Sequence, residues 1–360
     1  MIDLGTLPGG SMSDARAVNN SGHAVGSADT ASGETHAFLW VRGKMTDLGT
    51  LPGGTWSQAR AINEAGQVAG SSDVVVGDHR ETHAFRWSRG TMTDLGTLGG
   101  PYSGGYSIND VGQVTGDSYP PGPPFNYHAF RWSEGSMIDL GTLPGGSFST
   151  PFNQQNTSIN NRGEVIGYAD TAGGETHAFL WSKGTMHDLG APAGFPTSTA
   201  WAINNRSEVV GSAENGETVR AIRWTKATMI DLGTLPGGEA GGAGASDIND
   251  RGQITGASAT ATSFDAFLWS NGTMYDLGVL PGGTFSVGSF INLAGQVTGY
   301  GDVAGGDQHA FLWSRGTMFD LGTLGGPFSL PFGINNRGQV VGVSETASGS
   351  THGFITAVRS

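Results

Sequence analysis

One short segment, residues 79–83, places three potential metal ligands, His79, Glu81 and His83, at alternate positions. In an extended strand, alternate side chains lie on the same face. Two imidazoles and a carboxylate on one face would meet the needs of a three-ligand zinc site. The alternative, which we favour, is that this segment is a loop whose strand pairing begins only at Thr82, so that the three side chains do not converge.

A second group of acidic residues recurs in loops. Four loops contain an aspartate followed five residues later by a second carboxylate, and glycine lies between them or beside them. Two such carboxylates could contribute to a Ca²⁺ site, which needs several oxygen ligands. The favoured alternative is an Asx-turn that needs no ion, and no cofactor is therefore expected. The pairs are Asp29 with Glu34, Asp73 with Asp78, Asp170 with Glu175, and Asp302 with Asp307.

The signatures of common enzyme classes are missing. The sequence has no Gly-x-Ser-x-Gly elbow, no His-Glu-x-x-His motif, no Walker loop and no dinucleotide fingerprint. The 360 residues include no cysteine, which excludes thiol nucleophiles, thiolate metal sites and disulfides. Lys and Arg total 18 against 31 Asp and Glu, a formal net charge of −13, so nucleic acid is not an expected partner. No apolar run is long enough to suggest membrane insertion.

The elements that must position any such site are repeated. An Asp-Leu-Gly string recurs at intervals of 43 to 49 residues, and an apolar residue followed by Asn recurs with it. Eight copies therefore follow one another without linkers. The aspartates are Asp3, Asp47, Asp94, Asp139, Asp188, Asp231, Asp276 and Asp320, and the asparagines are Asn19, Asn63, Asn109, Asn160, Asn204, Asn249, Asn292 and Asn335.

One copy contains four short apolar segments separated by turn signals. In the second copy these segments, named strands A to D, are residues 59–62, 67–70, 83–87 and 92–95. Four antiparallel strands repeated without helices are typical of a β-propeller blade. The sequence therefore predicts an all-β, eight-bladed β-propeller with four antiparallel strands per blade.

The two ends of the chain complement each other. Residues 1–4 resemble a lone strand D, whereas the last copy stops after strand C near Phe354. If the first strand pairs beside the last one, no sheet edge is left open. We therefore expect one monomeric propeller domain, residues 1–360, in which residues 1–6 complete the blade formed by residues 332–360.

The repeated strings Thr-His-Ala-Phe-Leu-Trp and Asp-Leu-Gly-Thr-Leu-Pro-Gly-Gly resemble the HAF-repeat family of extracellular bacterial proteins. The His-Ala-Phe tripeptide begins at His36, His83, His128, His177 and His309, and it becomes His-Gly-Phe at His352. Two copies depart from the pattern, with Arg220 and Asp265 in the histidine position. The resemblance covers nearly the whole chain and implies an extracellular or cell-surface location, but no defined reaction.

Residues present in every copy are expected to serve the fold, because few sites need eightfold chemistry. The repeated aspartate is predicted to be a buried acceptor for turn amides, and the repeated asparagine to hydrogen-bond its own turn. The glycine of strand B is predicted to allow close backbone packing. The histidines are expected to hydrogen-bond across strands and not to share one metal.

Specificity is then expected where the copies differ. The loops from B to C and from D to A vary most, and strand order places them on one rim. Aromatic rings and amides there could contact a sugar, but for the repeated aromatics we favour the alternative that they hold their loops in place. The residues expected to contact a ligand are Tyr119, Phe125, Asn126, Tyr127, Phe152, Asn153, Gln154 and Gln155, followed by Trp56 and Tyr102.

These features predict a non-catalytic extracellular binding or surface-interaction module with a polysaccharide or protein ligand. The alternative is a polysaccharide-active enzyme, a lyase or a glycosidase, with its site on the same loop-rich face. Missing motifs weigh little against that alternative, because propeller enzymes draw their catalytic groups from different blades.

Overall fold

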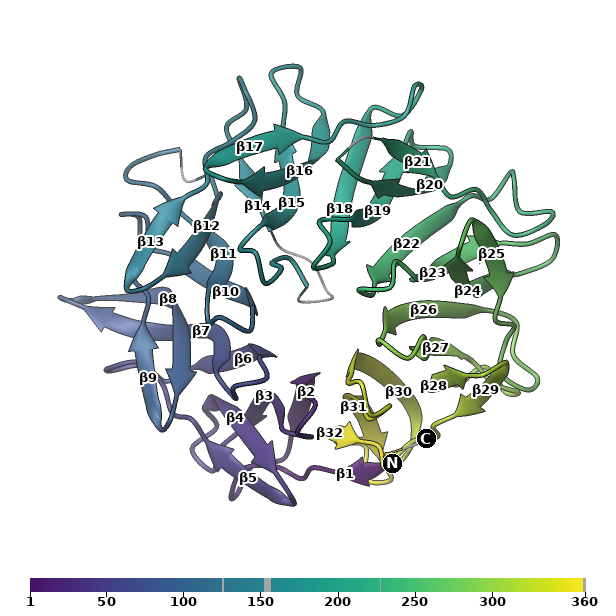
Figure 1. Ribbon diagram of the computed structural model, residues 1–360. Coiled ribbons are helices and arrows are strands. Elements are labelled where there is room, and N and C mark those ends of the chain that lie inside the picture. Colours follow the sequence, from purple (N-terminus) through teal and green to yellow (C-terminus); the bar gives the residue numbers. More distant parts are fainter. Residues whose placement is uncertain (125, 152–156, 227, 359–360) are drawn as a thin grey trace.

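The computed structural model describes residues 1–124, 126–151, 157–226 and 228–358. Within these ranges the chain forms 32 strands and no helix. Figure 1 shows the strands grouped into small sheets that follow one another round a ring in chain order. The all-β prediction is confirmed.

Six of the sheets contain four strands that pair antiparallel in chain order. The first three are β2 (Ser13–Val18), β3 (Ala24–Asp29), β4 (Thr35–Val41) and β5 (Lys44–Asp47); β6 (Ser57–Ile62), β7 (Val68–Val76), β8 (His79–Ser88) and β9 (Thr91–Asp94); and β10 (Ser103–Ile108), β11 (Val114–Ser118), β12 (His128–Ser133) and β13 (Ser136–Asp139). The next three are β14 (Ser149–Thr150), β15 (Val165–Asp170), β16 (Thr176–Ser182) and β17 (Thr185–Asp188); β18 (Thr197–Ile203), β19 (Val209–Glu214), β20 (Val219–Trp224) and β21 (Met229–Asp231); and β22 (Ala243–Ile248), β23 (Ile254–Ala259), β24 (Phe264–Ser270) and β25 (Thr273–Asp276).

The remaining strands form an eight-stranded sheet made of two antiparallel groups. A single parallel pair, Gln308 opposite Phe328, joins the groups. The first group is β26 (Ser286–Ile291), β27 (Val297–Asp302), β28 (Gln308–Ser314) and β29 (Thr317–Asp320). The second group is β30 (Gly325–Ile334), β31 (Val340–Thr346), β32 (Thr351–Ile355) and, from the other end of the chain, β1 (Ile2–Asp3).

The N-terminal strand lies beside the last strand of the chain. Ile2 is opposite Ile355 and Asp3 is opposite Phe354, in antiparallel register. The backbone N–H of Leu4 extends the ladder by donating to the carbonyl of Gly353 at 2.9 Å. In Figure 1, β1 accordingly lies beside β32.

The repeated phenylalanine of strand C forms the core between adjacent sheets. Phe85 is fully buried and packs in one cluster with Val25 and Ala37 of the preceding sheet. The strand-B glycine makes room for it: a Cβ atom on Gly70 would lie 2.0 Å from the carbonyl oxygen of Gln58 and 2.8 Å from the Phe85 ring. The predicted role of this glycine in close packing is confirmed.

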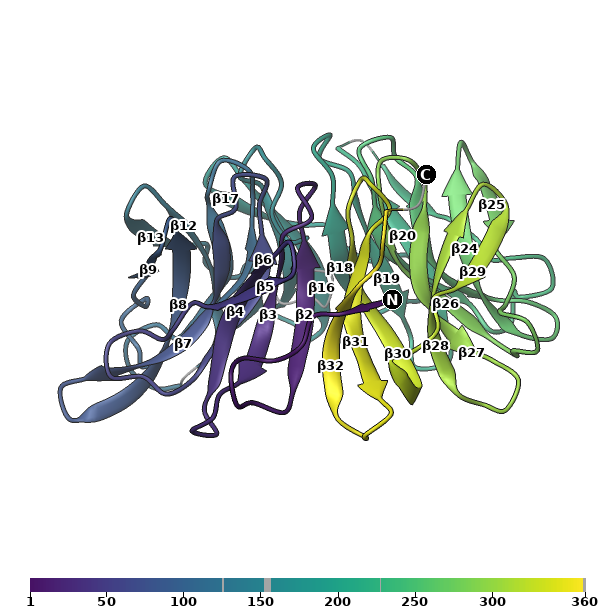
Figure 2. The same cartoon turned by 90° about the horizontal axis from the view of Figure 1, so that it is seen from below.

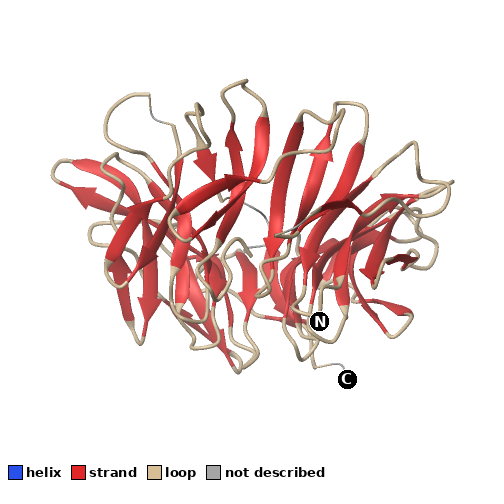
Figure 3. Ribbon diagram, turned by 45° about the horizontal axis from the view of Figure 1, so that its top comes forward, coloured by secondary structure: helices blue, strands red, loops and turns tan. Residues whose placement is uncertain are grey.

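The loops gather at the two ends of the strands, as Figures 2 and 3 show from two directions. One rim carries the B–C and D–A loops. On this rim, three aromatic residues of D–A loops each form an isolated backbone β-bridge with strand C of the preceding sheet. The pairs are Trp56 with Thr35, Tyr102 with Thr82, and Phe285 with Phe264. Backbone pairing therefore attaches each of these loops to its neighbour.

Several predicted strand limits were too short. The largest difference is at β7 and β8, which continue pairing out to Val76 opposite His79 through a tight turn in which Gly77 has a φ of 63°. The expectation that pairing would begin only at Thr82 was wrong. The hairpin is longer because three consecutive β-branched residues, Val74, Val75 and Val76, favour the strand conformation and extend the pairing past the usual loop position.

Candidate functional site

Three of the residues predicted to contact a ligand come together on the β10–β13 sheet. Tyr119 and Tyr127 belong to its long loop, and Tyr102 to the loop that enters the sheet. The Tyr119 and Tyr127 rings stack, with centroids 4.6 Å apart and 20° between their planes. The Tyr102 centroid lies 5.5 Å from each of the other two. We call these three residues the tyrosine cluster, and all three rings are partly exposed.

The other predicted contacts are more dispersed. The backbone N–H of Asn126, beside Tyr127, donates to the carbonyl of Pro124 at 2.9 Å. Trp56 lies on the loop before β6, in the preceding sheet, with 36% of its surface exposed. Phe125, Phe152, Asn153, Gln154 and Gln155 lie outside the described residues.

A buried polar network anchors Tyr102 of the tyrosine cluster. The hydroxyls of Tyr102 and Tyr106 are 3.1 Å apart, and the Tyr106 hydroxyl donates to Asp117 at 2.7 Å. Thr150, from the next sheet, donates to the other carboxylate oxygen at 2.6 Å. Burial raises the pKa of Asp117 to about 6, although these hydrogen bonds favour its ionised form. From the preceding sheet, the guanidinium of Arg60 lies 5.4 Å from the centroid of the Tyr106 ring.

The loop carboxylates hold the loops of their own sheets. Asp29 accepts hydrogen bonds from the backbone N–H groups of Ser11 and Met12 at 2.8 and 2.6 Å. Burial acts to raise the pKa of Asp29, but these donors and the Ser11 hydroxyl outweigh it and lower the pKa. Glu34 instead accepts from the hydroxyl of Ser32 at 2.9 Å. The same arrangement is found in three other sheets. There the carboxylate of Asp73, Asp170 or Asp302 accepts hydrogen bonds from two backbone N–H groups of the D–A loop.

In three of the four pairs the second carboxylate, Glu34, Asp78 or Glu175, has contacts of its own. Glu175 accepts from the hydroxyl of Thr171 at 2.9 Å, away from the amides that bind Asp170. In the described ranges, no three or more His, Asp or Glu side chains gather as they would around a metal ion. Ca²⁺ binding by these loops stays the less favoured alternative.

Only two of the three residues in the possible zinc group contact each other. The two ring nitrogens of His83 lie 2.9 Å from Asp94 and 3.1 Å from Glu81. Burial acts to lower the pKa of His83, but the two carboxylates outweigh it and raise the pKa. His79 lies instead 3.1 Å from Asp78, and both of these side chains are largely exposed.

The other repeated histidines also pair with the repeated aspartates across strands C and D. In six copies the histidine Nδ1 lies 2.8 to 3.0 Å from an oxygen of that aspartate, as in His36 with Asp47. The same aspartates accept from the turn glycine two residues later, as predicted. The prediction that they are buried was wrong: the Asp47 side chain is 42% exposed, because it lies on the outermost strand.

The repeated asparagines link neighbouring copies in a way that the sequence analysis missed. Each side chain accepts from its own turn, as predicted for Asn63, which accepts from the N–H of Gln67. Its Nδ2 also donates to the backbone carbonyl of the next asparagine round the ring. The last of these bonds runs from Asn335 to Asn19 at 2.9 Å, across 316 residues of sequence. The other seven donors are Asn19, Asn63, Asn109, Asn160, Asn204, Asn249 and Asn292.

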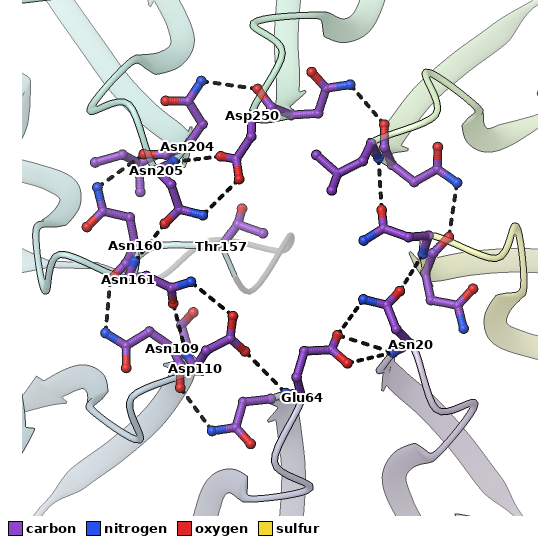
Figure 4. Close-up of a pocket in the computed structure, with 18 of the residues that line it drawn as sticks. Asn20, Glu64, Asn109, Asp110, Thr157, Asn160, Asn161, Asn204, Asn205 and Asp250 are labelled. Carbon is purple, nitrogen blue, oxygen red and sulfur yellow. Dashed lines mark hydrogen bonds between the residues drawn. The ribbon is translucent and has the colours of Figure 1, made fainter.

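These turns surround a cavity of about 400 Å³ at the end of the central channel. Figure 4 shows the side chains round its mouth. The residues that follow the repeated asparagines form a second circuit of hydrogen bonds. In each link, the backbone N–H of one such residue donates to a side-chain oxygen of the equivalent residue in the next copy, as from Glu64 to Asp110. The second circuit is interrupted between Asp250 and Leu293, because the Leu293 side chain has no oxygen that could accept a hydrogen bond from the Asp250 N–H.

A second feature that the sequence analysis missed is a β-bulge in the innermost strands. The bulge is present in the sheets formed by β2–β13 and by β18–β32. In each inner strand, the residue three positions before the repeated asparagine has no partner in the pairing register. These bulge residues differ between copies although their neighbours repeat, and bulges commonly re-aim side chains beside binding sites. They are Arg16, Arg60, Tyr106, Trp201, Ser246, Ser289 and Phe332. Variation at one position of an otherwise regular strand was the available sequence signal.

No family model and no curated protein matches this chain. Solved structures resemble it in fold at low sequence identity. The β-propeller domain of the Trilobed protease from Pyrococcus furiosus, which has an open velcro topology, matches with a TM-score of 0.54 and 9% identity. The match covers 88% of this chain and 99% of that domain.

Two larger proteins match over part of their length. Porphyromonas gingivalis dipeptidyl peptidase 4 has a TM-score of 0.58 and 9% identity, and the match covers 96% of this chain. A puromycin-hydrolyzing peptidase from Mycobacterium tuberculosis has a TM-score of 0.52 and 10% identity over 93% of this chain. The chain spans 58% of the length of each peptidase. At this identity the likeness identifies a β-propeller fold and nothing about activity.

The described part of the chain has no helix of the length and hydropathy that crossing a bilayer requires.

Proposed function

We propose that this chain is a non-catalytic binding module that recognises carbohydrate on its loop-rich face. The observation that carries the proposal is the tyrosine cluster. Stacked and edge-on rings that remain partly exposed offer flat apolar surfaces to the C–H faces of a sugar, while the hydroxyls and the nearby amide of Asn126 offer hydrogen bonds. A binding surface of this kind needs no cofactor.

The anchoring of the cluster supports a recognition role. Tyr102 is joined through Tyr106 to the buried carboxylate of Asp117, and Thr150 ties this group to the next sheet. Rings that are already ordered lose little conformational entropy when a ligand binds. The ligand is therefore expected to meet a preformed surface.

The proposed scaffold is a closed, monomeric, eight-bladed propeller. Pairing of β1 with β32 supports closure, and so does the hydrogen bond from Asn335 to Asn19. An extracellular or cell-surface location is proposed from the resemblance to HAF repeats. The net charge of −13 argues against nucleic acid as the partner.

The alternative is a polysaccharide lyase or glycosidase, and one observation favours it. Asp117 is a buried carboxyl group whose pKa is raised to about 6, a value suited to proton transfer near neutral pH. Its partner Tyr106 weakens the case, because burial and the nearby Asp117 charge raise the pKa of the phenol and make it a poor base. We therefore prefer binding without turnover.

The experiment is a binding titration with a panel of soluble neutral and acidic polysaccharides, with each mixture also assayed for new reducing ends and unsaturated products. We expect binding without product, and the variants Tyr119→Ala and Tyr127→Ala should each weaken it by about 1 to 3 kcal/mol. Tyr275→Ser is the matched control, because Tyr275 is an exposed tyrosine (52%) on the outer strand β25. Product formation would favour the enzyme, and unchanged binding by both alanine variants would move the site away from the cluster.

A further inference from the structure

A hollow of about 300 Å³ lies against the inner strands of three consecutive sheets, β18–β21, β22–β25 and β26–β29. Its walls combine three aromatic side chains with three serine hydroxyls and several small apolar residues. The aromatic residues are Trp201, Phe264 and Tyr300; the serines are Ser212, Ser246 and Ser289; and the rest of the lining is Gly244, Ala245, Ala257 and Val287.

The hollow exists because two successive bulge residues are small. Five other bulge positions carry large side chains, whereas Ser246 and Ser289 follow one another at the β22 and β26 bulges. Trp201, the bulge residue of the preceding sheet, then forms one wall of the space that remains. Its indole N–H donates to the Ser212 hydroxyl at 3.3 Å, which fixes the ring.

The β10–β13 sheet provides an internal comparison. A Cβ atom on Gly104 would lie 2.7 Å from the Tyr102 hydroxyl and 2.9 Å from the Tyr106 hydroxyl, so tyrosines occupy that space. A Cβ atom on Gly244, at the same place in the β22–β25 sheet, would meet only the Ser212 hydroxyl, at 3.3 Å. The same framework is thus filled in one sheet and hollow in another.

We propose that this hollow is a second site, separate from the tyrosine cluster, and that it binds a single ring of a neutral sugar. Aromatic walls suit the apolar face of a pyranose, and serine hydroxyls both donate to and accept from its hydroxyl groups. The volume is at the lower end of the range for ligand pockets, which fits one ring and not an oligosaccharide chain. The proposal extends the carbohydrate-binding function above and rests on it for the ligand class.

The lining also defines what the site rejects. It contains no charged side chain, so a uronic acid or an amino sugar would lose the hydration of its charge without gaining an ionic partner. It also lacks the pair of carboxylates that glycoside hydrolysis requires. The site is therefore a binding site that prefers neutral glycosides.

The test is saturation-transfer NMR with the intact chain and the methyl glycosides of glucose, galactose, mannose and glucuronic acid at tens of millimolar. We expect transfer to at least one neutral glycoside and none to the glucuronide. The variant Ser246→Tyr, which copies the chain's own Tyr106 into this bulge, should reduce affinity for that glycoside at least about tenfold. Tyr275→Ser, on the outer strand of the same sheet, is the control and should bind as the wild type does.

Two outcomes would overturn this site: no transfer to any neutral glycoside, or unchanged affinity in a folded Ser246→Tyr variant. If that variant does not fold, Gly244→Val replaces it, because its side chain projects into the same hollow from the β22 backbone. The Tyr127→Ala variant reports on the tyrosine cluster in the polysaccharide titration. A failure of the proposed function is therefore seen separately from a failure of this second site.

Discussion

Asp73 and Asp78 occupy the same loop region but have different surroundings. Asp73 is 7% exposed, and it accepts hydrogen bonds from the N–H groups of Thr55 and Trp56 at 2.8 and 2.7 Å. The Asp78 side chain is 89% exposed and contacts the His79 side chain, which is 78% exposed. The aspartate that recurs at the end of strand B is thus a structural acceptor for the D–A loop.

We expect Asp73→Ala to lower the free energy of unfolding by about 1 to 3 kcal/mol, because two loop N–H groups lose their acceptor. Asp78→Ala, the control, should change it by less than about 0.5 kcal/mol. Denaturant unfolding of both variants measures the difference. Equal stability of the two variants would contradict the assigned role.

The effect of Asp73→Ala should depend on pH. Burial acts to raise the pKa of Asp73, but the backbone hydrogen bonds and Arg80 outweigh it and lower the pKa in the folded state. The carboxylate therefore stabilises the fold fully above the unfolded-state pKa, near 3.9, and loses this contribution as pH falls through the folded-state value. The stability gap between wild type and variant should narrow in acid; a gap that widened would show the opposite sign of the pKa shift.

At the scale of elements, the A–B turns are joined by two circuits of hydrogen bonds. The asparagine circuit includes every copy, but the second circuit is interrupted at Leu293, which is 39% exposed. Each link of the second circuit joins a backbone N–H to a side-chain oxygen of the following turn, as between Leu293 and Asn336 at 2.9 Å. Leu293 itself can offer no such oxygen to Asp250.

Leu293→Asn should complete the second circuit, because the new side-chain oxygen can accept a hydrogen bond from the Asp250 N–H. Because the position is exposed, the gain is expected to be about 0.5 kcal/mol, at the low end for a hydrogen bond. Leu293→Ala, which removes the apolar side chain without adding an acceptor, is the control. A thermal melt in which Asn is no more stable than Ala would exclude the added bond.

Repetition explains what could be predicted from the sequence and what could not. The strand pattern and the glycine of Asp-Leu-Gly recur eight times, so local preferences reinforce each other and indicate a propeller. The asparagine bonds between copies were missed because their acceptors are backbone carbonyls more than 40 residues away, as with Asn19 and Asn63. The bulge residues were missed because a bulge depends on strand register, which turn and loop patterns do not reveal. The tyrosine cluster could be predicted because Tyr119 and Tyr127 lie in the longest and least repetitive loop, and Tyr102 is one of the aromatic residues that recur in the D–A loops.

At the scale of the whole molecule, the two ends of the chain carry the proposed closure. Leu4 and Leu7 pack in one cluster with Val341 and Ile355 from the last strands. The strand that precedes them, β1, covers the outer edge of β32. Loss of this segment would expose both an apolar surface and an unpaired strand edge.

Deleting residues 1–6 should therefore lower the melting temperature by roughly 5 °C or more, because Leu4 leaves a core position and β32 loses its partner. Deleting residues 358–360, which follow β32, is the matched control and should have little effect. Calorimetric melts of both deletions make the comparison. An unchanged melt of the first deletion would contradict closure between these strands.

The most direct test of the central claim, a carbohydrate-binding propeller with its site on the loop-rich face, is a crystal structure of the chain soaked with a glycan that it binds in solution. The account predicts difference density over the rings of Tyr119 and Tyr127, with the sugar intact. Density confined to the asparagine-lined mouth at the opposite end of the channel, or to the outer strands, would contradict it, and so would a cleaved sugar at any position.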